Sequence, residues 1–146
     1  MKEKEILQGR IDRIIKQIFH YLSYCVLEFL LQHPEHIKFS KGYQMKFFMV
    51  YMNTLIMNED YANFKEEYEQ MNMITDISNV FMQHHCISVE EIPLLFPLLT
   101  NNIIFKLLSN FQTDEMDIGG VKKEFLDELQ QKCTQDEIPT RSTFVA

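Results

Sequence analysis

The stretch 4-KEILQGRIDRIIKQIFHYLSYCVLEFLLQ-32 decides the fold of this 146-residue chain. Its apolar side chains recur at intervals of three or four residues, which places them on one stripe of a helix. The stripe comprises Leu7, Ile11, Ile14, Ile18, Leu22, Cys25 and Phe29, and it is widened by Ile15, Phe19, Val26 and Leu30. We therefore expect a long helix that lies deep in a bundle and ends before Pro34.

The same stripe also suits a two-stranded coiled coil, in which two helices pack along a seam of apolar residues. Such seams are usually narrower than this stripe and have charged residues on their flanks. In this alternative, Ile14 and Ile18 contact a second copy of the chain, and the helix acts as an assembly element.

The rest of the chain is also predicted to be mainly helical. Residues 43–57 are rich in Met and aromatic side chains and are apolar nearly all round, which predicts a buried helix. Ser88 lies three residues before Glu91, a pattern typical of a helix N-terminus. Segment 103–108 suits a helix or a buried strand, because the periodicity of a short apolar run does not distinguish the two.

These segments predict an all-α fold, an irregular bundle of about five to seven helices with room for one short strand near 103–111. We expect a single helical domain over residues 1–133. The remaining residues, 134–146, contain Pro139 and few apolar side chains, which indicates a flexible C-terminal tail.

Charge and cysteine usage limit the kinds of partner and compartment. The net charge of −7 argues against nucleic acid as the main partner, since phosphate contacts need clustered Lys and Arg. Three widely spaced cysteines favour a reducing, cytoplasmic location over a disulfide-bonded secreted protein. No stretch approaches 18 uninterrupted apolar residues, so we expect no membrane span.

Candidate catalytic and metal-binding residues are sparse. His84-His85-Cys86 is a local cluster of metal-ligand types, but zinc needs four ligands and no second pair has suitable spacing. Cys133 has no His near it in the sequence to activate a thiolate. We therefore expect no catalytic centre, metal or cofactor, and we rank a thiol or metal-dependent enzyme as the least favoured alternative.

Residues 111–126, FQTDEMDIGGVKKEFL, resemble the opening of a HECT ubiquitin-ligase domain. The matching positions are Asp117, Gly119, Gly120, Val121, Lys123, Glu124 and Phe125. The loop is one residue shorter than the usual form of that family, and the catalytic part of a HECT ligase would follow beyond this chain. The resemblance implies a truncated HECT-related fragment of the ubiquitin pathway that binds proteins but is not a ligase; the alternative is a convergent Gly-Gly turn.

The function that the sequence favours is a non-catalytic helical protein-interaction domain. Its partner surface is expected in the acidic second half or in the Met-rich segment, at Met45, Phe48, Met49 and Met52. This hypothesis predicts a sizeable exposed apolar patch. The alternative is a structural subunit or self-associating bundle built on residues 4–32, with contacts through Ile14 and Ile18, so that the partner is the chain itself.

Overall fold

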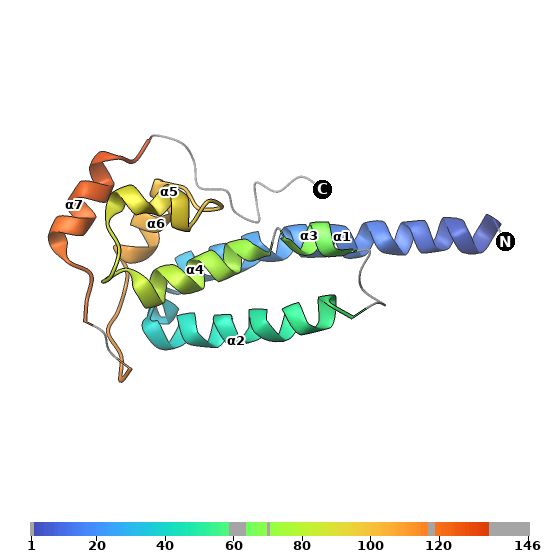
Figure 1. The fold of residues 1–146 in the computed structure, drawn as a ribbon, viewed down its shortest axis with the longest axis horizontal. Coiled ribbons are helices and arrows are strands. Elements are labelled where there is room, and N and C mark those ends of the chain that lie inside the picture. Colours follow the sequence, from blue (N-terminus) through green and yellow to red (C-terminus); the bar gives the residue numbers. More distant parts are fainter. Residues whose placement is uncertain (1, 59–63, 70, 117–118, 135–146) are drawn as a thin grey trace.

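The computed structural model describes residues 2–58, 64–69, 71–116 and 119–134, and it confirms the all-α prediction (Figure 1). The α-helices are α1 (Lys2–Gln32), α2 (Phe39–Ile56), α3 (Lys65–Glu69), α4 (Asn72–Gln83), α5 (Ile92–Leu95), α6 (Asn101–Leu108) and α7 (Lys123–Gln131). Short 3-10 helices cover Pro34–His36 and Val89–Glu91. Nearly all of the predicted tail, residues 135–146, lies outside the described residues, so the domain boundary at 133 stays a prediction.

The segment that suited either a helix or a strand is α6. Thr100 begins it, because its side-chain oxygen accepts a hydrogen bond of 3.3 Å from the backbone N–H of Ile103. Within the described ranges, β pairing near this segment is limited to one isolated parallel bridge between Lys38 and Gln112. The short strand expected near 103–111 is therefore wrong, and four of the eight residues of α6 are buried.

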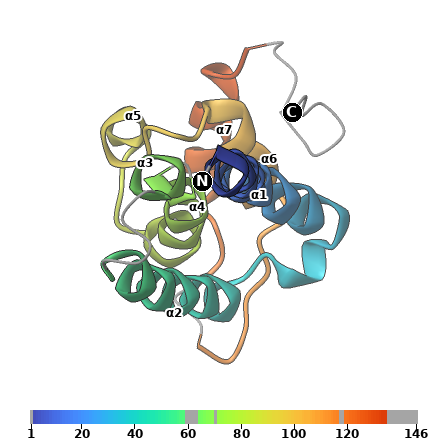
Figure 2. The ribbon, with the colours of Figure 1, turned by 90° about the vertical axis from the view of Figure 1, so that its right-hand side faces the viewer.

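Helix α4 lies at the centre of the fold. Seen end on, α1, α2 and α3 surround it (Figure 2). Most of its residues are buried, among them Met73, Ile74, Ile77, Val80 and Phe81. A helix that is apolar on several faces has to be covered by several neighbours, and α4 packs against α1, α2 and α6.

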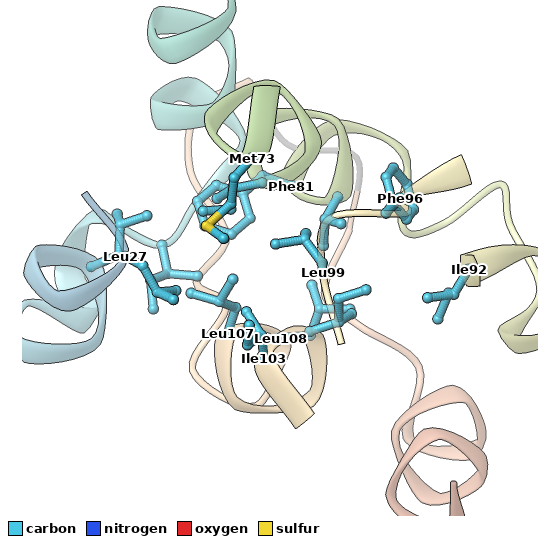
Figure 3. Close-up of a cluster of buried hydrophobic side chains, with 14 of the residues drawn as sticks. Leu27, Met73, Phe81, Ile92, Phe96, Leu99, Ile103, Leu107 and Leu108 are labelled. Atoms are coloured by element: carbon cyan, nitrogen blue, oxygen red, sulfur yellow. The ribbon is translucent and has the colours of Figure 1, made fainter. Parts of the chain in front are cut away.

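The larger of two buried clusters joins α1, α4, the segment from α5 to α6, and α7 (Figure 3). It includes Leu27, Leu30, Met73, Ile77, Val80, Phe81, Ile92, Phe96, Leu99, Ile103, Ile104, Leu107, Leu108 and Leu129. A smaller cluster under α2 contains Met49, Ile56, Phe64, Tyr68, Met71 and Ile74. Burial of these side chains is the main stabilising contribution to the fold.

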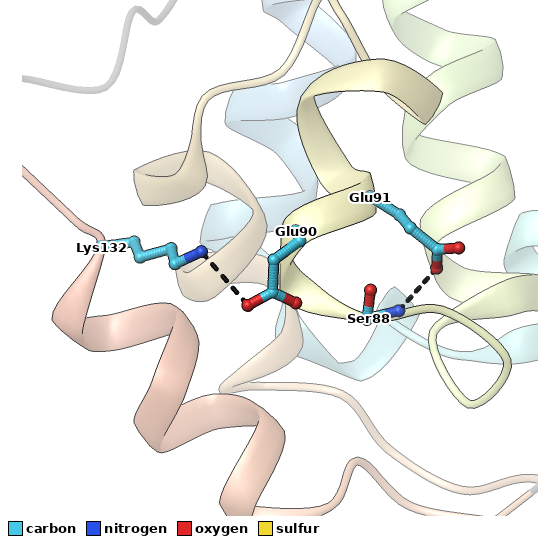
Figure 4. Close-up of polar contacts among 4 residues, drawn as sticks. All are labelled: Ser88, Glu90, Glu91 and Lys132. Carbon is cyan, nitrogen blue, oxygen red and sulfur yellow. Dashed lines mark hydrogen bonds and ion pairs between the residues drawn. The ribbon is translucent and has the colours of Figure 1, made fainter.

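Short polar contacts fix the turns between helices. Glu91 accepts a hydrogen bond of 2.8 Å from the backbone N–H of Ser88, as the sequence pattern predicts (Figure 4). Lys132, next to α7, lies 3.5 Å from a carboxylate oxygen of Glu90. At the start of α2, Asp114 accepts a hydrogen bond of 2.9 Å from the N–H of Ser40, so a residue 74 positions away caps this helix.

Helices α2 and α4 are in close contact at Gly42. A Cβ atom placed on Gly42 would lie 2.9 Å from Cβ of Phe81 and 3.0 Å from the carbonyl oxygen of Ser78. The Ser78 hydroxyl also donates a 2.7 Å hydrogen bond to the carbonyl oxygen of Gly42. Glycine is therefore required here for close packing of two helices, since any side chain would push them apart.

We predict that Gly42→Ala lowers the free energy of unfolding by about 1–2 kcal/mol, because overpacking outweighs the higher helix propensity of Ala. Gly9→Ala is the matched control: Gly9 is also helical, but a Cβ atom placed on it would have nothing within 4 Å. This control should be neutral or stabilising by up to about 1 kcal/mol. Urea denaturation followed by circular dichroism measures the free energy of unfolding of both variants. Equal effects of the two substitutions would show that the close packing of α2 and α4 at Gly42 does not require glycine.

Candidate interaction surface

The first half of α1 is exposed, contrary to the prediction that the whole helix lies deep in the bundle. It projects beyond the other helices (Figure 1). Leu7, Ile11, Ile14 and Ile18 are between 40% and 59% exposed. The core is contacted instead by Ile15, Phe19, Leu22 and Val26, which pack against the smaller cluster.

The first part of the predicted stripe is exposed because the helix turns a neighbouring face, rather than this stripe, toward the core. Each helical residue turns about 100° from the previous one, so Phe19 and Ile18 face different directions. The ring of Phe19 lies 6.2 Å from that of Phe64 and 6.3 Å from that of Tyr68, both edge to face. The widening residues Ile15, Phe19 and Val26 therefore meet the core together with Leu22. The earlier residues of the predicted stripe, Leu7, Ile11, Ile14 and Ile18, face solvent.

Helix α2 lies on the surface, so the prediction that it is a buried helix is also wrong. Its buried residues are Gly42, Met49 and Ile56, spaced by seven, which form a single line against its neighbours. Met49 also accepts a 3.2 Å hydrogen bond at its carbonyl oxygen from the hydroxyl of Tyr68. The exposed apolar residues around the rest of α2 are Tyr43, Phe47, Phe48, Val50, Tyr51 and Leu55.

The structure separates the four interaction residues predicted on α2. Phe48 is exposed, Met45 and Met52 are half-buried, and Met49 is buried in the smaller cluster. Met49 therefore belongs to the core, whereas the other three are at least partly exposed. The sequence pattern did not single out the other exposed aromatic residues of α2, although apolar side chains lie all round the helix.

Between the second half of α1 and the start of α2 lies an open hollow of about 270 Å³, which we call the α1–α2 groove. Its lining residues are Cys25, Val26, Phe29, Leu30, Lys41 and Met45. Lys41 supplies the one charge among these residues, and the others are apolar or a thiol. Such a lining suits apolar side chains of another molecule, because it offers few polar groups for recognising a polar ligand.

A second hollow, of about 210 Å³, lies on the opposite flank of α2 and is lined by Tyr43, Lys46, Phe47 and Val50. Apolar side chains with one lysine line it, as in the α1–α2 groove. Helix α2 thus presents apolar surface on both flanks while one line of its residues holds it to the core.

The Gly-Gly turn predicted at 119–120 contains a residue with unusual backbone angles. Gly119 has φ of 93°, in the left-handed region that glycine adopts readily. Gly120 and Phe125 line a small hollow of about 70 Å³ together with His84 and His85. Glu124 is exposed in the first turn of α7, and Asp117 lies outside the described residues.

His84, His85 and Cys86 do not form a metal site in the structure. His84 is buried, with its ring 4.5 Å from that of Phe111, whereas His85 and Cys86 are exposed. Among the described residues there is no group of three or more His, Cys, Asp or Glu that could hold a metal ion.

Cys133 is half-buried and is not activated as a nucleophile. Its thiol donates a 3.3 Å hydrogen bond to the carbonyl oxygen of Leu129. Burial raises the pKa of the Cys133 thiol, which disfavours the reactive thiolate. Neither candidate enzyme site gains support from the geometry.

His84 gives the fold a pH dependence. Burial, followed by the charge of His85, lowers the pKa of His84 from 6.5 to about 4. The unfolded chain therefore binds this proton more readily than the folded chain does. The contribution of His84 to stability is complete above pH 6.5 and is lost as the pH falls from 6.5 through about 4.

We predict that an NMR titration places the pKa of His84 near 4. His84→Phe should make the free energy of unfolding fall less steeply over this pH range, because the proton-binding difference disappears. His85→Phe, at the exposed neighbour, should keep most of the wild-type slope. A His84 pKa near 6.5, or equal slopes in wild type and His84→Phe, would show that the ring is hydrated.

By length and composition alone, α1 could also cross a membrane, a test that core helices of soluble proteins pass as well. The second half of this helix contributes Leu27 and Leu30 to the larger cluster, where both are fully buried. Those contacts hold this half of the helix against the bundle, while 18% of the most apolar 18-residue window of α1 is buried in the described structure.

Comparison with known proteins identifies the family. The family model of the DIL domain matches residues 13–115, more than half of the chain. None of the curated proteins matches, and no solved structure does.

The match corrects the resemblance to a HECT ubiquitin ligase, which is wrong. Asp117, Gly119, Gly120, Glu124 and Phe125 lie beyond the matched residues. Two glycines before a helix also suit a tight turn in an unrelated protein, because glycine adopts left-handed backbone angles readily. The chain belongs to the DIL domain family, a family of helical protein-interaction domains of the type that binds cargo in class V myosins.

Proposed function

We propose that this DIL domain binds a helical segment of a partner protein in the α1–α2 groove. The observation that carries the proposal is the apolar surface on both walls of the groove, formed by Phe29 on α1 and Met45 on α2. On the same two helices, Ile18 and Phe48 are also exposed. Exposed apolar surface that lines a hollow favours protein interaction.

A helix is the partner structure that fits the groove best. An amphipathic helix inserts side chains at positions i, i+3, i+4 and i+7 between two supporting helices, and its own backbone hydrogen bonds stay intact. An extended strand would instead need an open sheet edge, and the described part of the chain has none to offer. The half-buried Met45 and Met52 can adapt to different side chains, because Met is flexible and polarizable.

The same lining favours a non-catalytic role. Lys41 and the Cys25 thiol are the reactive groups that line the groove, and no acid, His or hydroxyl lines it with them. We further propose a cytoplasmic location, which is supported by the free thiols of Cys25, Cys86 and Cys133.

Self-association is the alternative, and a separate observation favours it. Leu7, Ile11, Ile14 and Ile18 have the spacing of a coiled-coil seam and are exposed on the projecting half of α1. A second copy of the chain could cover them in an antiparallel pair of α1 helices. This alternative is centred on the projecting half of α1 and the first proposal on Phe29 and Met45, so substitutions at the two places distinguish them.

The groove is tested by selecting helical peptides from a displayed library of amphipathic sequences on the wild-type chain. Phe29→Asp should weaken the recovered peptides at least about tenfold, because a charge would replace a central apolar contact. Leu94→Asp is the matched control, since Leu94 is 85% exposed on α5, and its effect should stay within about twofold.

Circular dichroism checks that both variants fold. Recovery of no peptide, or equal weakening by Phe29→Asp and Leu94→Asp, would show that the groove is not the binding site. Loss of binding in Ile14→Asp but not in Phe29→Asp would move the site to the projecting half of α1.

A further inference from the structure

The charges of the chain are divided between its helices. Helices α1 and α2, with Lys38 at the start of α2, carry eight basic and four acidic side chains. The rest of the chain carries six basic and seventeen acidic side chains. An acidic protein with a net charge of −7 therefore presents its two exposed apolar helices with a net positive charge.

The division is sharpest on α2, where Phe39–Ile56 contains Lys41 and Lys46 and no acidic residue. Lys41 lines the α1–α2 groove, and Lys46 lines the hollow on the other flank. A lysine therefore stands beside the apolar surface on each side of the helix.

The contacts of these lysines leave their charges available. The ammonium group of Lys41 donates to the side-chain oxygen of Gln44 at 2.9 Å, and that of Lys46 donates to the side-chain oxygen of Asn79 at 3.3 Å. Both acceptors are neutral amides. Among the hydrogen bonds of the described residues, the acid that contacts α2 is Asp114, and its carboxylate accepts a hydrogen bond from the N–H of Ser40 at the start of the helix.

We propose that the partner segment is an acidic amphipathic helix, with apolar side chains in the α1–α2 groove and Asp or Glu side chains toward Lys41. This inference rests on the proposed function of the groove. Apolar contacts supply most of the affinity in such a complex, and charge complementarity supplies orientation and rate of association. The acidic remainder of the chain repels the same segment from other faces, which gives specificity by exclusion.

A membrane rich in anionic lipid is the other surface that basic, apolar helices attract. The concave groove favours a protein helix, because a bilayer presents a broad surface and cannot insert a row of side chains into a hollow of about 270 Å³. Vesicle binding is therefore the competing outcome of the test.

The test uses peptides recovered by selection on the wild-type chain, resynthesised with the same apolar positions and with either Glu or Lys at every polar position. Fluorescence anisotropy measures their binding at low and high salt. The Glu peptide should bind at least about tenfold more tightly at low salt, and the difference should shrink as salt screens the charges.

Charge-reversed variants of the full chain locate the effect. Lys41→Glu should weaken the Glu peptide roughly two- to fivefold, as expected for one exposed charge pair. Lys106→Glu, the same charge change on the exposed side of α6, should leave its affinity unchanged. Equal effects of the two substitutions would overturn the proposed position of the acidic residues.

The outcomes separate this inference from the proposed function. Equal or tighter binding of the Lys peptide, with both peptides lost in Phe29→Asp, would overturn the acidic partner and leave the groove as the site. Failure of any peptide to be selected would overturn both. Binding to phosphatidylserine vesicles, without a preference for the Glu peptide over the Lys peptide, would assign the surface to a membrane.

Discussion

The close contact of α2 with α4 at Gly42 is the constraint on which the rest of the structure depends. Because Phe81 and Ser78 leave no room for a side chain there, the two helices approach along one narrow line, and α2 is held by its residues at 42, 49 and 56. Helix α4 is already covered by α1 and α6 on other faces. The remaining circumference of α2 therefore stays at the surface, with its aromatic side chains exposed.

The same geometry provides the exposed surface on which the proposed recognition depends. Helix α1 contributes its second half to the larger cluster and leaves Leu7, Ile11, Ile14 and Ile18 exposed. The exposed apolar surface of α1 and α2 coincides with the basic part of an acidic chain. Apolar contacts would provide affinity there, and the surrounding charges would decide which helices can approach.

The sequence predicted individual helices better than their faces. Periodicity predicted the long first helix, and Pro34 predicted its end. The pattern of Ser88 and Glu91 predicted the helix start that the structure contains. Periodicity does not say what covers an apolar stripe, so the exposure of Ile14 and Ile18 could not be deduced. Apolar residues all round residues 43–57 predict a buried helix, but only one line of α2 is buried. The absence of acidic residues from 39–56 is the sequence feature that sets the surface of α2 apart from the rest of this acidic chain. The seven positions around Gly119 that match the HECT opening led to the wrong family, because unrelated tight turns use the same glycines.

The central claim is that the apolar surface of α1 and α2 is uncovered in the single chain and complements a different protein. Light scattering combined with size-exclusion chromatography, over a wide range of concentration, tests it most directly. We expect the mass of one chain, 17.5 kDa, at every concentration. A concentration-dependent dimer that Ile14→Asp and Ile18→Asp dissociate, with the helical circular dichroism unchanged, would contradict the claim and make a second copy of the chain the partner of α1.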